Sequence, residues 1–268
     1  MSEDVHLHPV EVDLLCTFAE VEPPFPLEIP ETGRTDAERT LIFRAAREQL
    51  EKRGLADGEG PLGLADEFVH LLRFGDGVLD LVLAEEKTTV GAVVMADRKG
   101  TLIAVQRAAD PYGTVVLRQL TLDAAIDELM RIIPNLGPAQ IAPFTLPRKA
   151  LQTAFEALTA DLPQEDGVRP RRIPPQQVEE IMTRHGVDDR VSRRMVQYLQ
   201  PVLGNGQAGV ARRSGPSDDW DRSGDEVRWL DTENGRFRLA GDGDWMSVNP
   251  LAPDDTRAAL RKLAAALR

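Results

Sequence analysis

The sequence has 268 residues, of which 42% are hydrophobic, so it can bury a substantial core as one large domain or as two small ones. Its formal net charge of -12 at pH 7 makes nucleic acid a poor candidate partner. We expect a soluble, cytoplasmic protein, because no signal segment opens the sequence and no apolar run reaches the roughly 18 residues that a membrane span needs.

The first part of the sequence alternates between helical patterns and a proline-rich connection. A short strand is expected to lead into a helix at 9–18, and four prolines at 22–33 favour an extended surface segment. Thr35 is followed three residues later by a glutamate, which is the capping-box pattern and predicts a helix that runs to Gly54. A further helix is expected at about 64–74.

After these helices the hydrophobic period changes from near four to two. This change predicts an antiparallel meander of four strands, at 78–84, 90–96, 102–105 and 115–120. A helix with a threonine N-cap is expected to follow and to stop at Pro134.

The second part repeats this order after a predicted linker at 135–147. Helices are expected at 148–159, 176–185 and 188–202, with a second proline-rich stretch at 162–175. Four strands and a last helix then follow, at 208–212, 226–231, 236–240, 245–248 and from Pro253 onward.

The matching order of elements in 35–133 and 148–267 predicts how the chain is organised. We expect an α+β fold in which two pseudo-repeat halves, 1–137 and 138–268, form one domain and share one antiparallel sheet, because exposed meander edges would favour aggregation. Chance similarity is the alternative, since this order of elements recurs in many folds. The acidic excess lies in the first half, which has 25 acidic and 13 basic residues, whereas the second half has 19 of each.

The sequence contains no convincing catalytic or metal-binding pattern. Two G-x-G-x-x-G matches, beginning at Gly58 and Gly204, lack the strand-then-helix context of a dinucleotide site and are interpreted as turns. His6 and His8 have no acidic residue at a ligand-like spacing. The single cysteine, Cys16, lies among apolar residues and is expected to be buried. We therefore expect no enzyme activity, no cofactor and no metal.

One segment, 176–199, suggests an alternative function. It has a turn at Gly186 followed by a basic second helix with Arg190, Arg193 and Arg194, as in a helix-turn-helix DNA-binding regulator. The competing interpretation is a helical hairpin packed on the sheet, and the acidity of the first half favours it. The apolar side of that hairpin would consist of Met195, Leu199, Val202 and Leu203.

Several short segments resemble a known protein family over nearly the whole chain. In the second half they are 206–210, 229–237 and 244–250, which read GQAGV, WLDTENGRF and DWMSVNP, before a closing helix rich in alanine, leucine and arginine. In the first half they are 53–57 and 79–81, which read RGLAD and LDL. Together these segments resemble the EspG family of actinobacterial type VII secretion proteins.

The resemblance implies a cytoplasmic chaperone that binds the helical tip of the PPE subunit in PE/PPE heterodimers and keeps it soluble until secretion. It also implies a pseudo-twofold α+β fold with a C-terminal helical bundle. The resemblance implies neither a nucleic-acid partner nor a membrane partner. It leaves the oligomeric state open.

The resemblance further implies a contact surface made of the turn at 85–89, the strand at 90–95 and the helices at 176–203. The turn is short here, whereas it can be long and partner-selective in the family, so selectivity is not carried over. The hairpin residues of 229–237 are expected to be structural. The partner-binding candidates are Glu85, Glu86, Lys87, Thr88, Val90, Val93, Met95, Met182, Met195, Tyr198, Leu199 and Gln207.

Overall fold

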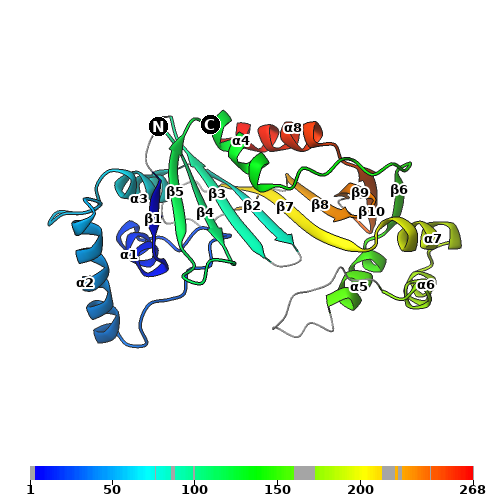
Figure 1. Ribbon diagram of the computed structural model, residues 1–268, viewed down its shortest axis with the longest axis horizontal. Coiled ribbons are helices and arrows are strands. Elements are labelled where there is room, and N and C mark those ends of the chain that lie inside the picture. Colours follow the sequence, from blue (N-terminus) through cyan, green and yellow to red (C-terminus); the bar gives the residue numbers. More distant parts are fainter. Residues whose placement is uncertain are drawn as a thin grey trace.

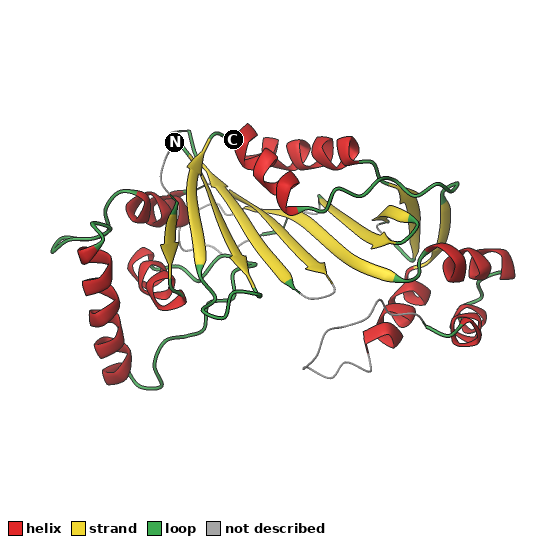
Figure 2. Cartoon of the chain, in the orientation of Figure 1, coloured by secondary structure: helices red, strands yellow, loops and turns green. Residues whose placement is uncertain are grey.

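The computed structural model describes residues 4–75, 77–85, 88–98, 100–159, 173–212, 221–222, 225–241 and 243–267. Within these ranges ten strands form one antiparallel sheet, and eight α-helices cover parts of its two faces (Figures 1 and 2). The fold class is therefore α+β, as expected. In the same ranges no helix is both long and apolar enough to cross a membrane.

The sheet has the strand order β1-β5-β4-β3-β2-β7-β8-β9-β10-β6. Its first half consists of β1 (Val5–Leu7), β2 (Gly77–Glu85), β3 (Thr89–Ala96), β4 (Thr101–Arg107) and β5 (Val115–Leu120). Its second half consists of β6 (Phe144–Pro147), β7 (Val202–Arg212), β8 (Glu226–Thr232), β9 (Gly235–Ala240) and β10 (Trp245–Pro250). The two halves are joined where β2 pairs with β7 along its whole length.

The helices are grouped by face and by end of the sheet. Those before β2 are α1 (Pro9–Ala19), α2 (Asp36–Lys52) and α3 (Leu64–Phe74), and those before β7 are α5 (Arg148–Thr159), α6 (Pro175–Arg184) and α7 (Asp189–Tyr198). The helices α4 (Leu122–Ile132) and α8 (Pro253–Ala264) contact each other on the opposite face (Figure 1). Two predicted N-caps are confirmed, since the hydroxyls of Thr35 and Thr121 each accept a backbone N–H at 3.2 Å.

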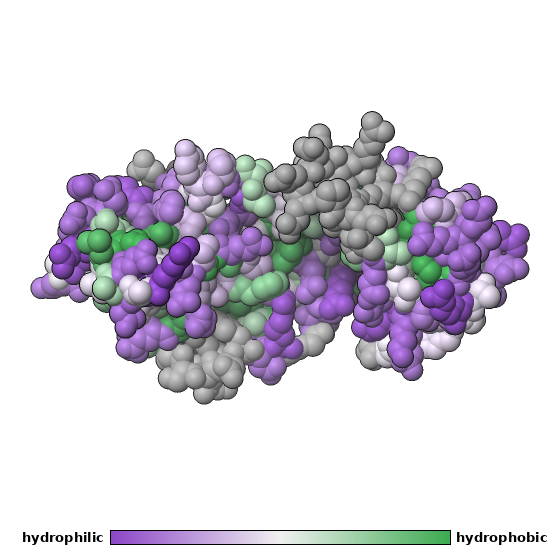
Figure 3. All heavy atoms as spheres, turned by 90° about the horizontal axis from the view of Figure 1, so that it is seen from below, coloured by the Kyte–Doolittle hydropathy of each residue, from purple (hydrophilic) through white to green (hydrophobic). Residues whose placement is uncertain are grey.

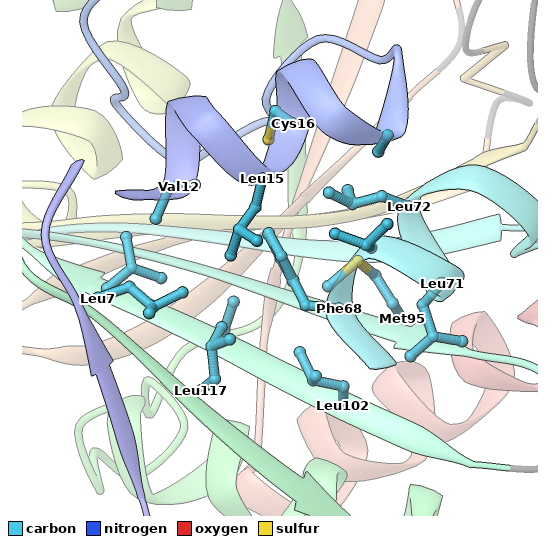
Figure 4. Close-up of a cluster of buried hydrophobic side chains, with 14 of the residues drawn as sticks. Leu7, Val12, Leu15, Cys16, Phe68, Leu71, Leu72, Met95, Leu102 and Leu117 are labelled. Carbon is cyan, nitrogen blue, oxygen red and sulfur yellow. The ribbon is translucent and has the colours of Figure 1, made fainter. Parts of the chain in front are cut away.

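Period-two alternation separates two faces of the sheet, which we call upper and lower. On β2, Leu79, Leu81 and Leu83 point to the upper face and pack in a cluster with α4 and α8. The lower face carries Val78, which packs with α1 and α3 in a second cluster (Figure 4), and Phe237, which packs with α5–α7 in a third. The first lower cluster reaches Val78 on β2 and Ala211 on β7, and the other reaches Leu230 on β8. Neither cluster includes Val82 or Gln207, which lie between them on the lower face.

Some predicted elements differ from the observed ones. The helix predicted to reach residue 202 ends at Tyr198, because Pro201 has no N–H to continue it, and Val202 and Leu203 belong to β7 instead of to an apolar helix side. The predicted linker contains an edge strand, β6, which pairs with β10. Trp245, expected to be half-buried, is 61% exposed at this edge.

The hairpin of β8 and β9 is packed more tightly than its composition suggests. Trp229 is 1% exposed, and its ring lies against β7, where a Cβ atom at Gly206 would come within 2.0 Å of the Trp229 ring. Only glycine fits at that position, so this glycine has a packing role. A turn separates β8 from β9, but its two residues are Glu233 and Asn234 instead of the predicted Asn234 and Gly235, and Gly235, with φ +112°, is the first residue of β9.

Candidate partner-binding surface

Between the two groups of helices, no described helix covers the lower face of β2 and β7 around Val82 and Gln207. Five partly exposed residues lie there: Val82 and Ala84 on β2, Asn205 and Gln207 on β7, and Arg228 on β8. Val82 is opposite Gln207 in the register, and Gln207 is opposite Arg228, so these side chains share one face. We call these five residues the central surface. In the view from below, apolar side chains are visible near the middle and also towards both ends, among larger hydrophilic areas (Figure 3).

The sequence explains why this part of the lower face differs from the core. On β2 and β7 the upper-face positions are aliphatic or small, and Leu81 and Ala208 there are fully buried. The lower-face positions hold short or amide side chains instead. Short side chains on a partly exposed strand surface let another chain approach the backbone closely, while the amides of Asn205 and Gln207 offer hydrogen bonds.

Arg228 supplies an unpaired hydrogen-bond donor within the central surface. One of its terminal nitrogens contacts the Glu226 carboxylate at 2.8 Å, but its Nε is buried and has no acceptor among the described residues. A buried donor without an acceptor is unfavourable by roughly 1–3 kcal/mol.

An arginine and a phenylalanine form one border of the central surface. Arg222 donates to both carboxylate oxygens of Asp80, at 2.5 and 2.6 Å, and its guanidinium lies 4.9 Å from the centre of the Phe25 ring. Asp80 is buried on the lower face of β2, whereas Phe25 is 55% exposed. The border therefore combines a charged group with an exposed aromatic ring.

The proline-rich segment that carries Phe25 is fixed to the sheet by polar contacts. The side-chain oxygen of Gln106 accepts the N–H of Glu28 at 2.7 Å, and the Gln106 amide donates to the Glu28 carbonyl at 3.1 Å. The segment can lie flat because Gly91 faces it, where a Cβ would come within 2.9 Å of the Pro26 oxygen. The position of Phe25 is thus set by β3 and β4.

Burial raises the pKa of Asp80 to about 6, although the charge and the hydrogen bonds of Arg222 act in the opposite direction. The carboxyl group of Asp80 therefore binds its proton more tightly in the folded state than in the unfolded state. The stability that this group contributes is fully present below pH 4 and is lost as the pH rises through about 6.

Asp80→Asn is expected to remove this pH dependence, because asparagine carries no charge to desolvate. The free energy of unfolding of the wild type should fall by about 2–3 kcal/mol relative to the variant between pH 4 and pH 7. Urea denaturation at several pH values measures this difference, with the exposed Asp225→Asn as a control that should follow the wild type. If the free energy of unfolding changed with pH in the same way for the wild type and Asp80→Asn, the raised pKa of Asp80 would be contradicted.

The predicted contact residues fall into three groups. Glu85 and Thr88 at the β2–β3 turn, Tyr198 at the end of α7 and Gln207 on the central surface all reach the solvent. Glu86 and Lys87 lie outside the described residues. The remaining six are buried: Val90, Val93, Met95, Met182, Met195 and Leu199.

The six buried candidates belong to the core and not to the exposed surface. Val90 points to the upper face, Val93 and Met95 pack under α1 and α3, and the other three lie in the cluster of α5–α7. Their side chains cannot touch a partner in this conformation, so they hold the surface in place. Val82, Ala84, Asn205 and Arg228, which the sequence did not single out, are the other residues of the central surface.

The helices α6 and α7 pack on the sheet as a hairpin. Met182 and Met195 are buried on its inner side, the Arg193 side chain donates to the Asp189 carbonyl at 3.1 Å, and the Arg194 guanidinium lies 5.8 Å from the centre of the Phe144 ring. This arrangement agrees with the packed-hairpin interpretation. The helix-turn-helix alternative finds no support in it.

The described residues contain no group of three or more His, Cys, Asp or Glu side chains that could hold a metal ion. His8 is the N-cap of α1, where it accepts the N–H of Val10 at 3.3 Å. Cys16 is 1% exposed, as expected, and burial raises the pKa of its thiol, which makes it a poor nucleophile.

Comparisons with known proteins agree with the fold. The model of the EspG family matches residues 8–262 of this chain. The structure is similar to that of the Mycobacterium tuberculosis type VII secretion system chaperone EspG5 in complex with the PE25–PPE41 dimer. The TM-score is 0.64 at 11% identity, over 99% of this chain and 97% of that chain, so the likeness shows a shared fold. A search of curated proteins gives no match.

Proposed function

Because the chain belongs to the EspG family, we propose that it is a cytoplasmic chaperone that binds PE/PPE-type heterodimers through the PPE subunit and keeps them soluble for type VII secretion. The observation that carries the proposal is the fold shared along nearly the whole chain with EspG5, a chaperone whose structure contains the PE25–PPE41 dimer. Binding without catalysis suffices for this role.

The contact is proposed to centre on the lower face of the sheet. The helical tip of the PPE subunit would lie over Val82 and Ala84, where short side chains allow close approach. Its terminal carbonyls would accept from the Arg228 guanidinium, since the side chain of Arg228 is 42% exposed. Glu85, Thr88 and Tyr198 would form the polar border. An apolar centre with a polar rim is the usual arrangement of such interfaces.

The chain is proposed to form one domain with two pseudo-repeat halves, 1–137 and 138–268. The strand order supports this, since β2 to β5 with β1 at the edge match β7 to β10 with β6 at the edge. The helices α4 and α8 follow the last strands of the two meanders and lie on the same face. The hairpin of α6 and α7, together with α5, forms the C-terminal helical bundle of the proposal.

Co-expression with PE/PPE pairs from the source organism tests the function. At least one pair should become soluble only when this chain is present, and the three proteins should elute together in size-exclusion chromatography. The proposal fails if every pair in that genome remains insoluble or elutes separately.

A further inference from the structure

The proline-rich segment lies directly beside the central surface. On β3, Gly91 is opposite Val82 in the register, and a Cβ atom at Gly91 would come within 2.9 Å of the Pro26 oxygen. Directly opposed residues on paired strands have Cβ positions roughly 5 Å apart. Pro26 therefore lies next to Val82 on the lower face, and the exposed Phe25 precedes it at the border of the central surface.

Arg222 covers the neighbouring position on the same face. Asp80 comes two residues before Val82 on β2, and Gly209 of β7 is opposite Asp80. A Cβ atom at Gly209 would come within 2.9 Å of the Arg222 nitrogen that donates to Asp80. The guanidinium thus lies close to the backbone of β7, and glycine at this position leaves room for it.

Phe25 and Arg222 form two sides of a corner beside Val82. The Arg222 guanidinium lies 4.9 Å from the centre of the Phe25 ring, and Val82 is partly exposed. The Arg222 side chain is itself 42% exposed. An aromatic ring, an aliphatic strand residue and the methylene stem of an arginine present apolar area here, whereas the charged end of the arginine is paired with Asp80. We call Phe25, Val82 and Arg222 the Phe25 corner.

The Phe25 corner is fixed before any partner binds. Asp80 is buried and holds Arg222 through hydrogen bonds at 2.5 and 2.6 Å, and Gln106 holds the proline-rich segment through its two hydrogen bonds with Glu28. A buried ion pair is often no more stabilising than two apolar residues of similar volume, so the main effect of this pair is to position Arg222. An exposed ring that is already held in place loses little conformational entropy when a partner covers it.

We propose that the Phe25 corner binds a bulky apolar side chain, such as leucine, methionine or phenylalanine, from the helical tip of the PPE subunit. Phe25 makes the contact, and Arg222, held by Asp80, positions the ring. The inference rests on the proposed chaperone function and extends that contact from Val82 onto the proline-rich segment. Aromatic residues and arginine are enriched in protein interfaces, and covering an exposed ring with apolar side chains favours the complex.

Competition between two differently tagged chains tests the proposal. The full-length wild type and a full-length variant are co-expressed with one PE/PPE pair, and the PPE subunit recovered on each tag gives the relative affinity. Phe25→Ala should recover at least about tenfold less PPE subunit than the wild type. Phe25→Gln should lose as much, because an amide offers little apolar area. Phe25→Tyr should recover nearly the wild-type amount, because it keeps the ring.

Arg222→Lys tests the positioning role of the arginine. A lysine keeps a positive charge beside Asp80 but has no planar guanidinium to lie over the ring. The substitution should lower the recovery of the PPE subunit when Phe25 is present. It should have little further effect in Phe25→Ala, because it acts through the ring. Losses that simply add in the double variant would contradict this role.

The matched control is Phe74→Ala, which removes another exposed ring that lies near an arginine. Phe74 is 57% exposed at the end of α3, and the Arg73 guanidinium lies 5.6 Å from the centre of its ring. It lies shortly before the first residue of β2, which is roughly 17 Å along the strand from Val82. Its replacement should therefore leave the recovery of the PPE subunit unchanged.

Three results would overturn the proposal: a loss below about twofold in Phe25→Ala, an equal loss in Phe74→Ala, or full recovery by Phe25→Gln. Both alanine variants should unfold at the wild-type temperature, since both rings are exposed, so a lower recovery reports on the contact. Absence of the PPE subunit from both tags would contradict the chaperone function itself, and is thus distinguishable from failure of this inference.

Discussion

Ala84→Arg is expected to abolish the complex with the PE/PPE dimer. Ala84 lies near the end of β2, opposite Asn205 on the lower face, where its short side chain leaves room for the proposed partner helix. An arginine there would hold the partner away and would place a charge in the apolar part of the contact. Affinity should fall by at least about 100-fold, which corresponds to about 2.7 kcal/mol. Co-purification of the PE/PPE dimer with tagged wild type and variant measures the loss.

The matched control for this change is Ala258→Arg. Ala258 is exposed on α8, on the other face of the sheet, so the same substitution there should leave the complex intact. Thermal unfolding of both variants shows whether either is misfolded. Retention of the complex by Ala84→Arg, or its equal loss in Ala258→Arg, would contradict the proposed contact.

Asp231→Ala is expected to lower the free energy of unfolding by about 3–5 kcal/mol, because it leaves a buried arginine without its counter-ion. The Arg236 guanidinium donates to both carboxylate oxygens of Asp231, at 2.6 and 2.7 Å, and to the Pro134 carbonyl at 3.0 Å. Arg236 is 1% exposed. Arg236 also joins the β8–β9 hairpin to the segment after α4. The loss of stability should therefore affect that segment as well as β8 and β9.

Urea denaturation measures this effect, and Glu226→Ala provides the comparison. The Glu226–Arg228 pair is partly exposed, so its removal should change stability by less than about 1 kcal/mol. Replacing Asp231 and Arg236 together with leucine and methionine should restore much of the stability, since no buried charge then remains unpaired. A loss below about 1 kcal/mol in Asp231→Ala would show that water reaches Arg236.

The period of the hydrophobic pattern predicted most of the sheet, because alternation along a strand follows directly from burial of one face. The strand β6 could not be predicted in the same way. It has four residues, ends in a proline and is held by its pairing with β10, which is a contact distant in the sequence. The exposed Trp245 at the same edge shows that tertiary position can override the preference of a large side chain for burial.

The candidate site was predicted as a region but not as a set of side chains. The resemblance indicated β3, the β2–β3 turn and the helices before β7, and burial then removed Val93, Met95 and Met182 from direct contact. A strand that is covered on one face and partly open on the other shows hydrophobic residues on both, so the sequence alone does not reveal which face is open. Val82 and Ala84 became candidates only when the gap between the two lower clusters was visible.

The hairpin that carries the most recognisable segment has a structural role, as the sequence suggested. Trp229, Arg236 and Phe237 are each no more than 1% exposed. Residues that are buried in this way preserve the fold, and a sequence segment kept by packing can identify a family without touching its partner.

Site-specific photo-cross-linking from Gln207 tests the central claim most directly. A benzoylphenylalanine at this position of the central surface, in protein co-expressed with a cognate PE/PPE pair, is expected to form a cross-link to the PPE subunit, whereas the same group at Ala258 is expected to form none. Cross-links from Ala258 with none from Gln207 would place the partner on the other face and contradict the account.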